Sequence, residues 1–188
     1  MHARTLVTGF GAFGQFDINP SALLAQTAGR PHVLLEVAFD AVDAFLSQAA
    51  KDRSLHGSFD RLLMLGVAGG ASTFRLEQLA RNHVGESPDV RGRSLPAGAI
   101  EPAGPDVLPT TLWQPAHLAA AGESAVSSDS AGTYLCNYAY YRALRLLPEK
   151  RVGFLHVPPL EAIPLDRQRE VLAGMLQAIE PPAGLARA

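Results

Sequence analysis

The sequence of 188 residues contains one cysteine, Cys136, so no disulfide can form within the chain. It also lacks any long block of one charge, since 16 Lys and Arg residues against 18 Asp and Glu residues give a formal net charge of -2. Without a basic stretch, neither nucleic acid nor an anionic membrane surface is expected as a partner. The six histidines show no pairing typical of a zinc site, so no metal is expected.

Long hydrophobic runs are absent as well. The first residues, MHARTLVTGFGAFGQF, hold one arginine and a short apolar stretch interrupted by glycines. This pattern fits neither a signal peptide nor a membrane span, so we expect a cytoplasmic protein. With 47% hydrophobic and 18% charged residues, the chain can bury a sizeable core. Its length suits a single domain over residues 1–188.

What the sequence does contain is a regular alternation of strand and helix signals. Strands are predicted at 5–10, 32–39, 61–67 and 151–157, with a weaker one at 124–128. Helices are predicted at 20–28, 41–54, 116–123, 134–147 and 165–179. Residues 74–82 fit either a strand or a helix, and 83–115 are mostly loop. This order predicts an α/β fold, a three-layer α/β/α sandwich with a largely parallel, twisted central sheet.

Ligands of such sheets bind at the carboxyl ends of the strands. Four features of the sequence fall at or just after predicted strand ends. They are the loop after Thr8, the loop after Val67, the segment leading to Cys136, and His156. Their convergence predicts a functional site at this edge of the sheet.

The lone thiol has the surroundings of a nucleophile. Cys136 falls in the first turn of a predicted helix, after the small and polar run SSDSAGT. Unpaired backbone amides and the positive end of the helix dipole favour a thiolate there. The alternative is a buried structural thiol, since cysteine is among the most buried residue types.

A nucleophilic thiol needs a base and a group that orients the base. His156, near the end of the last strand, is the best candidate for the base. Glu77 lies between apolar neighbours, where a carboxylate needs a partner, and is the candidate for the orienting group. Taken singly, His156 could instead cap the strand end, and Glu77 could pair with Arg75 or Arg81 on a solvated face.

A glycine pattern offers a competing hypothesis. Gly9, Gly11 and Gly14 spell G-x-G-x-x-G after a predicted strand, and Glu36 follows the last glycine by 22 residues. This spacing allows a dinucleotide-binding loop. However, the helix signal begins five residues after Gly14, at Asn19, and aromatic rings crowd the turn. A pocket for a small, flat, mostly apolar group suits these rings better.

Several longer segments together resemble one family. TGFGAFGQFDINPS, LGVAGG with FRLEQLARN, SAGTYLCNYAYY and GFLHVP occur in the order and spacing of pyroglutamyl peptidase I, also called pyrrolidone carboxyl peptidase. The resemblance implies an α/β sandwich in the cytosol, often a homotetramer. It also implies a cysteine peptidase that removes N-terminal pyroglutamyl residues from peptides without metal or cofactor.

When the family's functional positions are matched to this sequence, the resemblance implies Cys136 as the nucleophile, His156 as the catalytic histidine and Glu77 as the catalytic glutamate. It implies substrate-binding roles for Phe10, Phe13, Tyr134, Leu135 and Val67, the first three as the aromatic residues that hold the pyrrolidone ring.

The chain also departs from the family's usual sequence. Val67 and Ala71 stand where the family has a glutamine and an arginine, Ala12 replaces a proline, and residues 86–90 lack an expected arginine. These changes leave the three catalytic positions in place and predict weaker or altered substrate binding. Two alternatives therefore stay open: a catalytically weak relative that binds lactam-like N-termini, and a dinucleotide-dependent oxidoreductase.

Overall fold

The apolar runs of the sequence form the strands of one main sheet. The structure is a computed structural model that describes residues 4–51 and 59–180. The main sheet has six strands in the order β2-β1-β3-β8-β4-β7. These strands are β1 (Thr5–Phe10), β2 (His32–Leu35), β3 (Arg61–Val67), β4 (Phe74–Glu77), β7 (Ala125–Ser128) and β8 (Arg151–Val157). A separate antiparallel pair consists of β5 (Leu79–Arg81) and β6 (Val107–Pro109).

Strand direction changes once across the main sheet. β2, β1, β3 and β8 are parallel to one another, whereas β4 is antiparallel to β8 and parallel to β7. The carboxyl ends of β3 and β8 therefore lie beside the start of β4. In this register His156 lies between Gly66 on β3 and Arg75 on β4.

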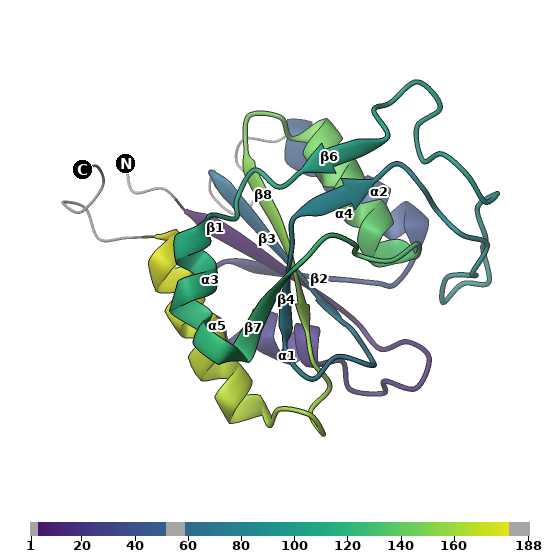
Figure 1. Cartoon of the computed structure of the whole chain (residues 1–188). Coiled ribbons are helices and arrows are strands. Elements are labelled where there is room, and N and C mark those ends of the chain that lie inside the picture. The colour runs from purple at the N-terminus through teal and green to yellow at the C-terminus, as the bar shows by residue number, and fades with distance from the viewer. Residues whose placement is uncertain (1–3, 52–58, 181–188) are drawn as a thin grey trace.

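Helices cover both faces of the sheet (Figure 1). One layer contains α1 (Pro20–Thr27), α3 (Pro115–Ala121) and α5 (Leu165–Ile179), and the other contains α2 (Phe39–Lys51) and α4 (Leu135–Leu146). A short 3-10 helix, Gly122–Ser124, follows α3. Each layer has its own apolar core against the sheet. The predicted three-layer α/β/α sandwich with a largely parallel sheet is thus confirmed.

Local sequence signals account for most element bounds. Six of the seven residues of β3 and of β8 are buried, which is why both read as nearly continuous apolar runs. Asn19 caps α1, since its side chain accepts a hydrogen bond from the backbone N–H of Ser21 at 3.0 Å. The ambiguous residues 74–82 form two short strands, and the long loop contains β6.

The prediction was wrong at the end of one strand. β2 stops at Leu35, and Phe39 already belongs to α2. The backbone N–H of Phe39 donates to Asp89 Oδ2 at 3.2 Å, so a side chain 50 residues away helps to set the start of this helix. The end of the predicted helix 41–54 lies outside the described residues.

Within residues 4–51 and 59–180, no helix is both long enough and apolar enough to cross a membrane. In the same ranges no group of three or more His, Cys, Asp or Glu side chains could hold a metal ion. The assignment of residues 1–188 to a single domain stays a prediction.

Candidate active site

Glu77 and His156 form a buried pair at the carboxyl end of β8. His156 Nδ1 lies 2.8 Å from Glu77 Oε1. His156 is 7% exposed and Glu77 is fully buried. The antiparallel register places Glu77 opposite Phe154, two residues before His156. Because side chains two residues apart point to the same face of a sheet, Glu77 and His156 meet on one face.

Cys136 approaches this pair from the helical layer above the sheet. It is the second residue of α4, after the N-cap residue Tyr134, and it is partly buried. Its thiol is near enough to His156 to raise the pKa of the imidazole. Since Nδ1 of His156 faces Glu77, the other ring nitrogen is the one available to the sulfur. The structure therefore brings the three predicted catalytic residues together in the series Glu77, His156, Cys136.

The surroundings favour a charged imidazole. Burial lowers the pKa of His156, but the hydrogen bonds and charges of Cys136 and Glu77 outweigh burial and raise this pKa to about 9. Glu77 Oε2 is buried and has no hydrogen-bond partner among the described residues. The negative charge of Glu77 is thus directed at the imidazole. This environment can hold the His156 side chain as an imidazolium near neutral pH.

Gly66 makes room for the sulfur, and the sequence analysis did not single it out. A β-carbon at this position would lie 3.0 Å from Cys136 Sγ and 2.8 Å from the Phe154 ring. An isolated glycine within an apolar strand is a signal for such close approach. That signal was present in the sequence, but it does not say which group comes close.

A small apolar cavity lies next to the thiol. It is lined by Phe10, Phe13, Asn19, Val37, Gly66, Val67, Tyr134, Leu135 and Cys136. All five predicted substrate-binding residues are among them. The free volume of the cavity is about 10 Å³, which is room for about one water molecule. Its walls must therefore separate to admit a five-membered ring.

Hydrogen bonds to backbone groups hold two sides of this cavity in place. Phe13 and Phe16 exchange two backbone hydrogen bonds of 3.1 and 2.9 Å. The Asn19 side chain donates to the carbonyl oxygen of Gly11 at 2.9 Å, so the residue that caps α1 also fixes the loop after β1. Sequence reasoning found Asn19 as a cap and missed it as a lining residue. The Tyr134 hydroxyl donates to the carbonyl oxygen of Pro88 at 2.9 Å.

The segment that departs most from the family pattern, residues 86–90, packs on the outer side of this cavity. The Asp89 carboxylate accepts hydrogen bonds from the backbone N–H groups of Phe39, Arg91 and Arg93. Burial raises the pKa of Asp89, but these donors outweigh burial and hold the pKa below its usual value. The backbone N–H of Val90 donates to the carbonyl oxygen of Val37 at 3.1 Å. An ionised carboxylate thus holds this loop against a lining residue.

The glycine-rich loop has a different local structure from a dinucleotide-binding turn. A β-carbon at Gly9 would lie 2.3 Å from the carbonyl oxygen of Ser21, so this glycine permits close packing of α1 on β1. The helix begins at Pro20, six residues after Gly14. Glu36, the candidate ribose-binding acid, forms an ion pair with Arg91. The dinucleotide hypothesis is not supported.

The site thus combines a cysteine at a helix start with a histidine that is hydrogen-bonded to a buried glutamate, beside an apolar cavity. This combination suits a cysteine peptidase. The sequence model described as pyroglutamyl peptidase matches residues 3–178. The chain belongs to the pyroglutamyl peptidase family.

Individual relatives are similar over most of their length. The pyrrolidone-carboxylate peptidase of Lactobacillus helveticus is 32% identical over 173 residues, covering 84% of this chain and 84% of that protein. The one from Mycobacterium tuberculosis is 33% identical over 177 residues, covering 86% of this chain and 79% of that protein.

Solved structures agree with this result. The pyrrolidone carboxyl peptidase from Thermus thermophilus is 36% identical, with a TM-score of 0.75 over 93% of this chain and 99% of that chain. A mutant of the enzyme from Pyrococcus furiosus is 26% identical, with a TM-score of 0.82 over 94% and 97% of the two chains.

Proposed function

We propose that this chain is a cysteine exopeptidase that hydrolyses the amide bond after an N-terminal pyroglutamyl residue. Cys136 is the nucleophile, His156 the general base and acid, and Glu77 the group that orients the histidine. The observation that carries the proposal is the contact of 2.8 Å between Glu77 and His156, a histidine whose pKa the nearby Cys136 also raises. Family membership supports the choice of substrate, since its relatives are named pyrrolidone-carboxylate peptidases.

The first chemical step forms the thioester. The Cys136 proton moves to His156, whose raised pKa favours holding it. Glu77 accepts the Nδ1–H hydrogen bond, which fixes the tautomer and stabilises the imidazolium. The thiolate attacks the pyroglutamyl carbonyl carbon. His156 then donates its proton to the nitrogen of the leaving peptide as the amide bond breaks.

The second step releases the acid. His156 takes a proton from water, the resulting hydroxide attacks the thioester, and Cys136 leaves as a thiolate. In both steps negative charge develops on the carbonyl oxygen. The first backbone N–H groups of a helix have no partner within the helix. Those at the start of α4, including that of Cys136, are the proposed donors to this oxyanion.

Specificity follows from the character of the cavity. A pyroglutamyl lactam carries no charged amine, whereas a free N-terminus would lose hydration among Phe10, Phe13 and Leu135. Since the free volume is about 10 Å³, substrate entry requires a wall to move. Phe13 is the proposed moving wall, because it is half-buried and lies in the loop between β1 and α1.

The departures from the family pattern leave a second candidate function. Val67 is 6% exposed and lines the cavity with an apolar side chain, and Ala71 is also buried. A site with fewer polar side chains supports a relative that binds lactam-like N-termini and turns them over slowly. A homo-oligomer, with a tetramer as the specific form, and a cytoplasmic location are proposed on the family resemblance alone.

The test is turnover of a pyroglutamyl fluorogenic amide by the purified protein. We expect hydrolysis, with no hydrolysis of the matching prolyl amide, whose ring nitrogen is charged. Binding of the pyroglutamyl amide without turnover would favour the second candidate. Absence of both binding and turnover would contradict either function.

A further inference from the structure

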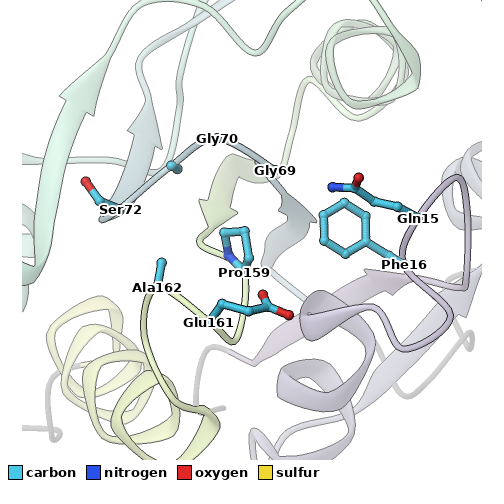
Figure 2. Close-up of a pocket in the computed structure, with 9 residues that line it drawn as sticks. Gln15, Phe16, Gly69, Gly70, Ser72, Pro159, Glu161 and Ala162 are labelled. Carbon is cyan, nitrogen blue, oxygen red and sulfur yellow. The ribbon is translucent and has the colours of Figure 1, made fainter.

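A second, larger cleft lies beside the cavity at Cys136. Its volume is about 670 Å³, and it is lined by Gln15, Phe16, Gly69, Gly70, Ala71, Ser72, Pro159, Glu161 and Ala162. Figure 2 shows Gln15 and Phe16 on one side of the cleft and Ser72 on the other, with Gly69 and Gly70 along its back. The Glu161 side chain extends from the loop after β8 toward the side that carries Phe16 (Figure 2).

The two cavities have adjoining walls. Phe13 lines the small cavity and Phe16 lines the cleft, and their rings lie 5.6 Å apart. Val67, the last residue of β3, lines the small cavity, while Gly69, two residues further along the chain, lines the cleft. A peptide with its first residue in the small cavity can therefore extend past Phe13 and Phe16 toward the cleft.

Each cavity has a connection to the proposed catalytic residues. Cys136 lines the small cavity, and His156 precedes Pro159 of the cleft by three residues at the end of β8. The amide bond that Cys136 attacks joins the pyroglutamyl residue to the rest of the peptide. With the ring on one side of this bond, the leaving peptide lies on the other side.

We propose that the cleft binds the one or two residues that follow the pyroglutamyl group, and that Glu161 selects a positively charged side chain there. This inference rests on the proposed function. The volume of about 670 Å³ falls within the range of roughly 300–1,000 Å³ that is typical of ligand sites. It is far larger than the volume of the cavity beside Cys136, so the two sites are suited to different parts of one substrate.

Charge gives the cleft its selectivity. Glu161 is the one ionisable residue among its nine lining residues, and it is exposed. None of the ion pairs formed among the described residues includes Glu161. A lysine or arginine in the leaving peptide can therefore pair with it, while an aspartate or glutamate would be repelled. An ion pair at an exposed site changes the ratio of kcat/KM between a lysine peptide and a glutamate peptide by about two- to fivefold.

The experiment compares pyroglutamyl tripeptide amides that carry lysine or glutamate at the first or second position after pyroglutamate. We expect the wild-type kcat/KM to favour lysine about two- to fivefold at one of these positions. This preference should shrink at high salt because exposed charges are screened. Glu161→Gln should remove the preference, and Glu161→Lys should reverse it.

The matched control is Glu149→Lys, which makes the same change in charge at the opposite edge of the sheet. Glu149 is exposed and lies two residues before the start of β8, away from the cleft. This variant should keep the wild-type preference. Thermal unfolding of each variant checks that the fold is retained.

Two results would overturn the inference. One is equal kcat/KM for the lysine and glutamate peptides at both positions, and the other is a lysine preference that survives Glu161→Lys. Either result is compatible with the proposed function if the fluorogenic amide is hydrolysed. If the wild-type protein hydrolyses neither the fluorogenic amide nor any of the peptides, the proposed function itself is wrong, and this inference is wrong with it.

Discussion

Gly66 and Cys136 come so close that a β-carbon on the first would lie 3.0 Å from the sulfur of the second. Gly66 also lies beside His156 in the register of β3 and β8. The strand thus has no side chain at the place where the thiol meets the imidazole. Any larger residue must move the sulfur, the Phe154 ring or the strand.

Gly66→Ala is expected to lower kcat strongly because it displaces the Cys136 sulfur from His156. Overpacking of a core position typically costs about 1–3 kcal/mol, so stability should fall as well. Steady-state kinetics and urea unfolding measure the two effects. Gly174→Ala is the control, since a β-carbon there would have only an ordinary contact of 3.6 Å. Unchanged kcat in Gly66→Ala would contradict the close packing around the sulfur.

Cys136→Ala and Cys136→Ser are expected to abolish hydrolysis and leave the fold intact, because alanine has no nucleophile and a hydroxyl is far less acidic than a thiol. The side chain is partly buried and is the one cysteine of the chain. Alkylation of the wild-type protein should therefore remove activity in proportion to the label incorporated, as mass spectrometry can follow. A fully alkylated protein with full activity would restore the hypothesis of a structural thiol.

The pH dependence follows from the pKa of His156, which is raised from 6.5 to about 9. A histidine with a raised pKa in the folded state contributes stability that is fully present below pH 6.5 and is lost as pH rises through about 9. The free energy of unfolding should therefore fall over this range. The kcat/KM should also fall as pH rises through about the same value, because the His156 imidazolium then loses its proton. Urea unfolding and kinetics at a series of pH values test both, and flat profiles would contradict them.

Glu77→Gln is expected to lower activity less than loss of Cys136 does, but far more than a surface change, because Glu77 acts through the histidine. Removal of its negative charge also lowers the pKa of His156. The basic limb of the kcat/KM profile should consequently move to lower pH. A variant with reduced activity and an unshifted limb would make Glu77 a purely structural residue.

Phe13→Ala is expected to raise KM for pyroglutamyl substrates more than it lowers stability. An aromatic contact is typically worth about 0.5–1.5 kcal/mol beyond area burial, which corresponds to an increase of roughly two- to twelvefold. Phe45 lies on the buried face of α2 in the apolar core. Phe45→Ala should do the opposite and lower stability with little effect on KM. Early unfolding of Phe13→Ala with a normal KM would assign its ring to the core.

The sequence alone determined the layer architecture and most of the order of elements, with residues 74–115 as the exception. Short apolar runs such as those of β3 and β8 favour strands covered on both faces, and Asn19 with Pro20 encodes a helix start locally. The position of Cys136 at a helix start was also readable, because capping and dipole effects depend on a few adjacent residues. Its candidate partners His156 and Glu77 were also identified from their positions in the sequence, and the family resemblance implied the same residues.

Only the tertiary structure decided which distant groups meet. The contact between Glu77 and His156 requires β4 to pair antiparallel with β8, and no pattern within either strand specifies that neighbour. The start of α2 at Phe39 depends on a carboxylate 50 residues away. The cleft around Glu161 is built from loops after β1, β3 and β8. Local periodicity reports the face that a residue buries, whereas partners distant along the chain are set by how whole elements pack together.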